Sequence, residues 1–543
     1  MTSISPHPDV SPWTITTVSD PGSREQQPND IKSSLQDAQP PHRLGRNNNM
    51  GNLIPLVVAL GAVALAYTFL TDPLRKIPGP LAARFSRLWM VQRSRSGNMH
   101  TTMIALHSKH GKLVRTAPNE VSISDPAAIK TIYGAGSKFR KSDWYSVWQG
   151  HRTFDLFGER DEKIHGKQRR LVSNIYSLDQ LKKMEPYVDS TLTLFLERLG
   201  DVGSKGAVDM GTWAQMFAFD VIGEVTFSRR FGFLAAGKDD GSFSAIDSAL
   251  ISAAWIGQIP WLYWLHDFFM PYTGNYLGVN NRNGSLRQFA ARECDARKGR
   301  GSDHRDMLHA LMDVKEQKPD EFDDNGVLSM AASNIFAGSD TTGISIGAIL
   351  YNLCKNSRCK DKLLEEIRRA VQNEGLDTTQ NMPFKVGHGM PYLQACIYEA
   401  LRMHPAVGMS LPRVVPQEGF EIDGTFIPAG TIIGANPWVI HRQKEVFGND
   451  CDIFRPERWL EGDRSQMDRN FFAFGSGSRT CIGRNLSWIE MTKLVPSLLM
   501  RFDIELAHPD EKPEQHCWWF VKQEGLNMRL IPRSQKIDSP VLG

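Results

Sequence analysis

The sequence predicts a mainly α-helical protein with small β-sheets. Long stretches show the three- or four-residue hydrophobic spacing of helices, and short stretches show the alternating spacing of strands. Apolar residues recur every three or four positions over 178–199 and 326–356, which gives a helix one apolar face. Short alternating stretches over 113–124 and 420–434 are typical of strands, and an Asp-Gly pair in the second stretch favours a tight hairpin. Helices are therefore expected to dominate and the sheets to be short.

The N-terminal region divides into a polar tail and an apolar run. Residues 1–50 are rich in Ser, Pro, Asn and Gln and lack apolar periodicity, which predicts a disordered tail that cannot bury a core. The uncharged run LIPLVVALGAVALAYTFL follows within 51–71, and as a helix it would reach about 27 Å, enough to cross a bilayer core. We therefore predict a single transmembrane helix there, with a buried core helix or a cleaved signal peptide as the alternatives.

The charges around this run predict its orientation. Arg43 and Arg46 precede it, whereas more positive residues follow it, which favours a cytosolic position for the rest of the chain. The prolines in KIPGP exclude a helix, so we expect a proline-rich linker over 72–82 and one folded body over 83–543. The positive residues behind the run are Arg75, Lys76, Arg84 and Arg87.

Composition narrows the possible functions. The chain has 543 residues with 63 Lys and Arg against 60 Asp and Glu, a net charge of +3, and no basic run with interleaved aromatic residues. Nucleic acid is therefore not expected as a partner. Seven cysteines are too few for a disulfide scaffold at this length, and none forms a C-x-x-C pair. A reducing compartment fits this usage, and one thiol can have a special role.

One cysteine lies in the glycine-rich stretch FAFGSGSRTCIGRNL. Gly475, Gly477 and Gly483 permit positive φ and allow the backbone to approach a flat cofactor, while their N–H groups can point at the sulfur of Cys481. A thiolate that binds a metal needs such donors, and Arg479 can pair with a carboxylate of the cofactor. A buried structural thiol in a glycine-rich turn is the alternative.

The spacing of this stretch favours the cofactor. Phe474, Gly477, Arg479, Cys481 and Gly483 match F-x-x-G-x-R-x-C-x-G, which resembles the heme-binding loop of the cytochrome P-450 family. The likeness covers roughly residues 75–535. It implies the cytochrome P-450 fold and a heme b with Cys481 as its axial thiolate ligand, which favours cleavage of the O–O bond.

The resemblance also implies a reaction and its partners. Electrons would come from NADPH through a membrane-bound reductase, with cytochrome b5 as an optional second partner, and one oxygen atom of dioxygen would enter a C–H bond. The heme-binding catalytic domain over 83–543 would lie in the cytosol at the endoplasmic reticulum membrane. A heme-thiolate isomerase or dehydratase, or a heme-binding membrane protein without enzymatic activity, would use the same loop, so both remain alternatives.

Two charged motifs match the family in the expected order. Glu399 and Arg402 form an E-x-x-R pair, and Arg458 ends a P-E-R motif before the cysteine loop. The resemblance implies that these three charges form a buried network on the cysteine side of the heme. An exposed i, i+3 pair on a helix surface is the alternative, because such pairs are common.

The segment AGSDTT lies inside the predicted helix over 326–356. Glycine and consecutive threonines are poor helix formers, so a local distortion is expected. The segment resembles the dioxygen groove of the family, in which Asp340 and Thr341 would pass protons toward dioxygen. A packing seam between two helices is the alternative.

Four basic residues match the positions at which the family binds the heme propionates. They are His165, Arg169, Arg413 and Arg479. His165 replaces the commoner tryptophan, and its imidazole N–H can also donate to a carboxylate. A surface histidine is the alternative at this position.

Two further stretches bear on the substrate. Residues 156–177 are similar to fungal enzymes of the pisatin demethylase type, which oxidise phytoalexins or secondary metabolites of the fungus itself. Residues 254–272 carry many aromatics and few charges, which is typical of a surface that faces a membrane or guards an apolar channel. We therefore expect a lipophilic small-molecule substrate, with ordinary core packing of 254–272 as the alternative.

Overall fold

The computed structural model describes residues 55, 59–61, 63, 66–67, 69–275, 287–302 and 304–533. The chain divides into two compact units, Met1–Lys76 and Ile77–Gly543. The predicted tail over 1–50 and much of the predicted membrane helix over 51–71 lie outside the described residues. Within the part of the chain that the structure describes, no helix has both the length and the apolar character needed to span a membrane.

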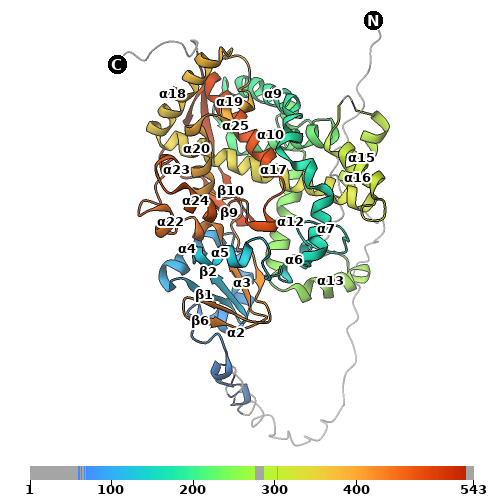
Figure 1. The fold of residues 1–543 in the computed structure, drawn as a ribbon, viewed down its shortest axis with the longest axis vertical. Helices are drawn as coiled ribbons and strands as arrows, with labels where there is room; N and C mark the ends of the chain where they lie inside the picture. The colour runs from blue at the N-terminus through green and yellow to red at the C-terminus, as the bar shows by residue number, and fades with distance from the viewer. Residues whose placement is uncertain are drawn as a thin grey trace, which may run out of the picture. The chain divides into compact units, whose positions relative to one another are not determined.

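Helices make up most of the larger unit, as the apolar periodicity predicts, and the sheet of β1 and β2 lies at the end opposite α9 and α18 (Figure 1). The described helices are α2 (Leu81–Phe85), α3 (Leu88–Arg95), α4 (Met99–His110), α5 (Pro126–Tyr133), α6 (Trp144–Gln149), α7 (Glu162–Val172), α8 (Leu178–Lys182), α9 (Glu185–Gly203), α10 (Met210–Phe227), α11 (Phe233–Ala236), α12 (Ser242–Ile256), α13 (Pro260–Thr273), α15 (Arg287–Arg300), α16 (Met307–Gln317), α17 (Asp324–Lys355), α18 (Ser357–Glu374), α19 (Phe384–His388), α20 (Pro391–Met403), α21 (Pro437–Ile440), α22 (Lys444–Phe447), α23 (Arg458–Glu461), α24 (Arg464–Asn470) and α25 (Arg484–Arg501).

The long helix α17 forms the centre of this unit, and Figure 1 shows it crossing the middle of the ribbon. Asp323 begins it, because its carboxylate accepts a hydrogen bond from the N–H of Gly326. Most of its side chains are buried, and it packs against α10, α15, α20 and α25. A helix that is apolar on nearly all sides requires such neighbours on every side. The long helix predicted over 326–356 is thereby confirmed.

Four small sheets complete the unit. One has the order β1-β2-β7-β4 with β2 and β7 parallel, one has the order β3-β11-β8, and the pairs β9-β10 and β5-β6 are antiparallel hairpins. The strands are β1 (Leu113–Ala117), β2 (Glu120–Ile123), β3 (Val208–Asp209), β4 (Arg413–Val414), β5 (Phe420–Ile422), β6 (Thr425–Ile427), β7 (Ile432–Ala435), β8 (Phe502–Leu506), β9 (Glu514–Trp518), β10 (Phe520–Glu524) and β11 (Asn527–Pro532).

Two local predictions can be compared with these elements. Asp423 and Gly424 join β5 to β6 with φ values of 50° and 68°, as a tight hairpin of this type requires. The periodic stretch over 178–199 is not one helix but two, since α8 ends at Lys182 and α9 begins at Glu185. Pro186 in the first turn of α9 explains the break, because proline lacks the N–H that would continue the helix from α8.

Candidate active site

The cysteine loop lies between α24 and α25 and is closed by a hydrogen bond from the N–H of Cys481 to the carbonyl of Phe474, at 2.8 Å. Gly475 and Gly477 have φ values of 69° and 61°. A Cβ at Gly477 would lie 2.1 Å from the carbonyl oxygen of Tyr133, so only glycine fits there. Gly477 therefore allows the cysteine loop to pass close to the backbone of Tyr133.

Gly483 differs from Gly475 and Gly477, because its φ of −80° does not use the positive φ that a glycine permits. Gly483 is the N-cap that precedes Arg484, the first residue of α25, and the N–H groups of Gly483 and Arg484 donate toward the sulfur of Cys481. Burial raises the pKa of the Cys481 thiol, while these two N–H groups and the guanidinium of Arg169 oppose the shift. Cys481 itself is exposed. The two N–H groups and Arg169 are the groups that would stabilise a thiolate at this position.

Five basic side chains converge near this loop. Four are the predicted residues His165, Arg169, Arg413 and Arg479, and the fifth is Lys141. Burial, followed by Arg479, Lys141, Arg169 and Arg413, lowers the pKa of His165 to about 2. The imidazole is therefore neutral, and it is 2% exposed, which excludes the surface histidine.

Lys141 was not predicted, and it is a buried cation. Burial and then the charges of Arg479 and Arg413 hold the pKa of Lys141 well below its usual range. Its ammonium lies 4.3 Å from the ring centre of Tyr145 and 5.0 Å from that of Phe157. The sequence KFRKS holds three basic residues and does not indicate which of them turns inward.

The acids around this basic cluster are fewer than the bases. Arg479 pairs with Glu162 of α7 at 2.8 Å and donates to the carbonyl of Glu159 at 2.7 Å. Arg413 donates to the Tyr145 hydroxyl at 3.3 Å and to a carbonyl, so it has no acidic partner in the described chain. Buried cations with too few anions favour a ligand that carries carboxylates. The two propionates of a heme fit this requirement.

The predicted ion-pair network is present and buried. Arg402 donates to both oxygens of Glu399 at 2.8 and 2.9 Å, and Arg458 donates to the same carboxylate at 2.9 Å. Glu399 and Arg402 are 0% exposed, which excludes the alternative of an exposed helix pair. Burial alone would raise the pKa of Glu399, but Arg402 and Arg458 hold it below its usual value. All three members therefore stay charged and paired.

His441 connects this network to the cysteine loop, and the sequence did not single it out. One ring nitrogen donates to the carbonyl of Arg402 at 3.0 Å, and the other accepts the N–H of Phe472 at 2.7 Å. Burial and then Arg402 lower the pKa of His441 to about 3, so the ring stays neutral and can fill both roles. A single histidine in WVIHRQ carries no pattern that would have revealed this connection.

Asp340 and Thr341 lie in the middle of α17. Asp340 is 1% exposed, and its carboxylate accepts a hydrogen bond from the side-chain amide of Gln215 and lies 3.4 Å from the ammonium of Lys522. The helix is continuous here, so the expected distortion is absent, and Thr341 donates to the carbonyl four residues earlier at 2.8 Å. Thr342 contacts Ser487 at 2.8 Å, which places this segment beside the first turn of α25 and the cysteine loop.

An aromatic cluster borders the basic cluster. Trp519, at the tip of the β9-β10 hairpin, lies 4.8 to 5.8 Å from the ring centres of Trp144, Trp148 and Phe157. Trp519 has a φ of 96°, a rare conformation for a bulky residue that persists only where surrounding packing holds it. The cluster is joined to the basic cluster through Phe157, which contacts Lys141.

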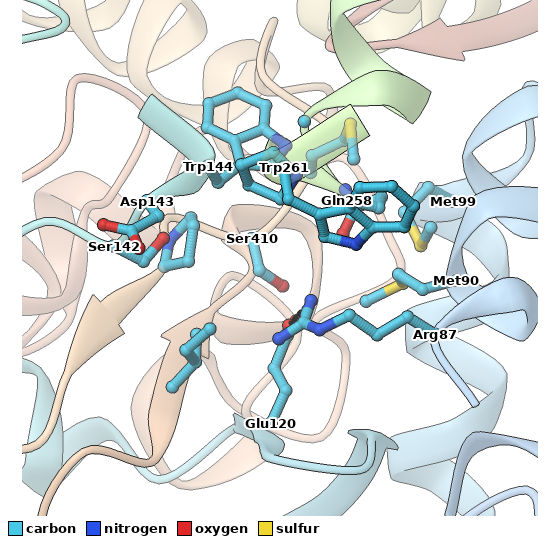
Figure 2. A pocket seen from close by; sticks show the side chains of 15 residues that line it. Arg87, Met90, Met99, Glu120, Ser142, Asp143, Trp144, Gln258, Trp261 and Ser410 are labelled. Carbon is cyan, nitrogen blue, oxygen red and sulfur yellow. Dashed lines mark hydrogen bonds and ion pairs between the residues drawn. The ribbon is translucent and has the colours of Figure 1, made fainter. Parts of the chain in front are cut away.

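A pocket of about 270 Å³ lies next to Trp144 (Figure 2). Methionine and tryptophan side chains form one part of its wall, and the ion pair between Arg87 and Glu120, at 3.0 Å, forms another. Among the described residues, the buried Trp144 N–H and the hydroxyl of Ser142 have no hydrogen-bond partner, and both residues line this pocket. An apolar wall with two polar groups is typical of small-molecule sites.

The aromatic segment over 254–272 packs into the core only in part, because Ile256 and Tyr263 are buried against Val147 while most of the remaining side chains are not. It contributes α13, of which only Tyr263 is buried. Trp261 lines the pocket and is 66% exposed, and Phe268 and Tyr272 are 71% and 85% exposed. A face of this size is unusual on a soluble protein surface and is typical of contact with a membrane or a partner.

The fold and the chemistry of the loop are those of a heme-thiolate protein, and comparison with known proteins gives the family. A model of the cytochrome P-450 family matches residues 78–530, so the chain belongs to the cytochrome P-450 family. It is an oxidoreductase of the monooxygenase type, in which heme is held by a cysteine thiolate and a redox partner supplies the electrons.

Three fungal relatives are similar along most of their length. Cytochrome P-450 monooxygenase hepC of Aspergillus oryzae is 39% identical over 467 residues, 82% of this chain and 91% of the relative. Cytochrome P-450 monooxygenase cicH of Emericella nidulans is 37% identical over 500 residues, 89% and 99% of the two chains. Pisatin demethylase of Fusarium vanettenii is 36% identical over 482 residues, 87% and 92%. The predicted resemblance to enzymes of this last type is confirmed.

Proposed function

We propose that Cys481 is the axial ligand of the heme, with Phe474, Gly477 and Gly483 shaping the loop around it. The observation that carries this assignment is the convergence of five buried or half-buried basic groups beside a thiol at a helix N-terminus. His165, Arg169, Arg413 and Arg479, with Lys141, hold the propionates. When bound, the heme supplies the redox chemistry of oxygen insertion.

The protein would supply protons and position the substrate. The buried Asp340 carboxylate takes up protons and passes them toward the dioxygen site, and the Thr341 hydroxyl directs them there. Glu399, Arg402 and Arg458 form a structural network that fixes the loop through His441. The relatives are monooxygenases, which favours this reaction over isomerisation, dehydration or heme binding alone.

The substrate is a lipophilic small molecule that carries a hydrogen-bond acceptor. The aromatic cluster around Trp519 and the apolar wall of the pocket favour a molecule with flat apolar surface. The N–H of Trp144 and the hydroxyl of Ser142 can both donate to an oxygen of that molecule. A secondary metabolite or a phytoalexin has these properties, and one relative is named for the demethylation of pisatin.

The chain would be held at the endoplasmic reticulum membrane by one helix within 51–71, after a disordered tail over 1–50. The linker over 72–82 then joins it to a cytosolic catalytic domain over 83–543, where NADPH-cytochrome P-450 reductase and cytochrome b5 can reach it. The exposed apolar face of α13 supports contact with a lipid surface. Trp261 of that face also lines the pocket, so the pocket would lie beside the membrane. A lipophilic substrate could then pass from the membrane into the pocket.

Reduced protein with carbon monoxide tests the axial ligand. The wild type should show the red-shifted Soret band of a thiolate-ligated heme, and Cys481→His should abolish it. Cys354→Ser is the matched control, because Cys354 lies at the end of α17 and contacts the carbonyl of Ile504. A band that survives Cys481→His and disappears with another cysteine would overturn the assignment.

A further inference from the structure

Trp144 belongs to two regions of the molecule. It lines the pocket of about 270 Å³, together with Trp261 (Figure 2). It is also a member of the aromatic cluster, since its ring centre lies 4.8 Å from that of Trp519 and 5.2 Å from that of Trp148. Among the described residues, Trp144 is the one member of the aromatic cluster that also lines the pocket. Its indole is therefore the group that the pocket and the cluster share.

The indole of Trp144 packs directly against Gly257, which also lines the pocket. A Cβ at Gly257 would lie 2.6 Å from Nε1 and 2.8 Å from Cδ1 of Trp144, which is too close for non-bonded atoms. The backbone does not require glycine here, because Gly257 follows the last residue of α12 with a φ of −59° and a ψ of −20°. The edge of the indole that carries the N–H thus occupies the space that a side chain at Gly257 would fill.

The N–H of Trp144 gains no hydrogen bond in this position. Trp144 is 6% exposed, and its Nε1 has no partner among the described residues. Two other buried tryptophans are satisfied, because Trp438 donates to the carbonyl of Pro405 at 2.9 Å and Trp459 donates to Glu399 at 2.8 Å. A buried N–H without an acceptor raises the free energy of the conformation that holds it. The indole of Trp144 is therefore held in place by packing alone.

We propose that Trp144 is a gate between the pocket and the aromatic cluster, and that the indole is closed when it rests against Gly257. The proposal rests on the proposed function, because it takes the pocket as the entry site of the substrate and the aromatic cluster as the side nearer the heme. A flat molecule with an oxygen acceptor draws the unpaired N–H away from Gly257, and the indole turns to let it pass. A molecule of a few atoms needs no such movement, so Trp144 determines specificity by size.

The test uses nitrogen ligands of the heme iron, because their binding shifts the Soret band whether or not the substrate is known. Imidazole is the small probe, and clotrimazole, which carries three aryl rings, is the bulky one. Stopped-flow spectra of the full heme-loaded chain give the association and dissociation rates of each probe, and a titration gives its Kd. A gate changes both rates of the bulky probe together, whereas a residue that only binds the probe changes its Kd.

Trp144→Ala should raise both rates of clotrimazole by about 10-fold, keep its Kd within about 3-fold and keep the rates of imidazole within about 2-fold of the wild type. Gly257→Ala pushes the indole out of its closed position, so it should raise the clotrimazole rates by about 5-fold. It should add nothing in a variant that already carries Trp144→Ala, because the group with which it collides is gone. Trp144→Phe, which is smaller and lacks the N–H, is the second variant if Trp144→Ala fails to load heme.

Two matched controls should leave the rates of both probes unchanged. Trp255→Ala removes a neighbouring tryptophan of α12 that lies under Arg95, 5.4 Å from its ring centre, and does not line the pocket. Gly200→Ala adds a methyl group to a glycine of α9, where it would meet only the ring of Phe502 at an ordinary distance of 3.6 Å.

Two contrary results have different meanings. If the Trp144 variants leave the clotrimazole rates unchanged, or change the rates of imidazole as much as those of clotrimazole, the gate is wrong and the heme site stands. If neither probe shifts the Soret band of the wild type, the heme site of the proposed function fails, and the gate fails with it.

Discussion

Glu399 and Asp340 are both buried carboxylates, yet their surroundings differ. Glu399 accepts five hydrogen bonds, two from Arg402 and one each from Arg458, Trp459 and the backbone of Arg455. Asp340 accepts one hydrogen bond from Gln215 and keeps one oxygen for a hollow that opens to solvent. A carboxylate whose oxygens all accept hydrogen bonds, here called saturated, cannot gain a proton without losing some of those bonds. A carboxylate with an oxygen that accepts none, here called unsaturated, can gain one. One region therefore holds the fold, and the other is suited to chemistry.

The largest expected effect is on the saturated side. Glu399→Ala leaves Arg402 and Arg458 buried without a counterion, which should lower the free energy of unfolding by about 3–5 kcal/mol and prevent stable heme loading. Glu365→Ala is the matched control, because Glu365 pairs with Arg368 and Arg369 on the exposed surface of α18. Urea unfolding and the carbon monoxide spectrum measure both effects. Equal losses in the two variants would remove the distinction between the two kinds of carboxylate.

The same contrast explains what the sequence predicted and what it did not. The spacing around Cys481 and the E-x-x-R motif identified residues whose partners lie at fixed distances along the chain. Lys141 and His441 escaped, because each acts through groups far away in the sequence. The sequence also did not show which of the three glycines uses a positive φ, since Gly483 at the start of a helix looks the same in sequence as a glycine in a turn.

The elements of the fold were likewise predicted where they depend on local sequence and missed where they depend on distant partners. Periodicity identified α17 and the β5-β6 hairpin, which depend on local pattern. It joined α8 and α9 into one stretch, because the apolar spacing continues across the break that Pro186 helps to create. The hollow beside Asp340 brings together α10, α12, α17 and β10, and no local pattern indicates that meeting.

A smaller effect concerns acid sensitivity. Burial lowers the pKa of His100, His107 and His404 to about 4 in the folded chain, against about 6.5 when unfolded. Between these values the unfolded state binds more protons, so stability is full above pH 6.5 and falls as the pH drops toward 4. Each histidine should contribute about 1.4 kcal/mol per pH unit to this fall.

Urea unfolding at pH 7 and pH 5 measures the slope. His107→Asn should reduce it by about one such contribution, because His107 lies on α4 away from the cysteine loop. His151→Gln is the control, since the side chain of His151 is 76% exposed. If His107→Asn left the slope unchanged, His107 would not be a buried neutral histidine that resists protonation in the folded chain.

A still smaller effect on stability is expected at the exposed face of α13. Trp261→Gln with Phe268→Gln should change the free energy of unfolding by less than about 0.5 kcal/mol, because both side chains are mostly exposed. Binding of the catalytic domain to phospholipid vesicles should weaken, which a flotation assay measures. Unchanged binding would mean that this apolar surface serves another partner.

The most direct test of the contrast is Thr341→Ala. The Thr341 hydroxyl donates only within its own helix, so its loss should leave stability and the carbon monoxide spectrum unchanged. The measurement is the ratio of hydrogen peroxide formed to NADPH oxidised, in the wild type and in Thr341→Ala with the same reductase. The account predicts a clear rise of this ratio in the variant, because protons are no longer directed to the dioxygen site. An unchanged ratio with an intact spectrum would contradict the claim that the Asp340 side of α17 carries out the proton chemistry.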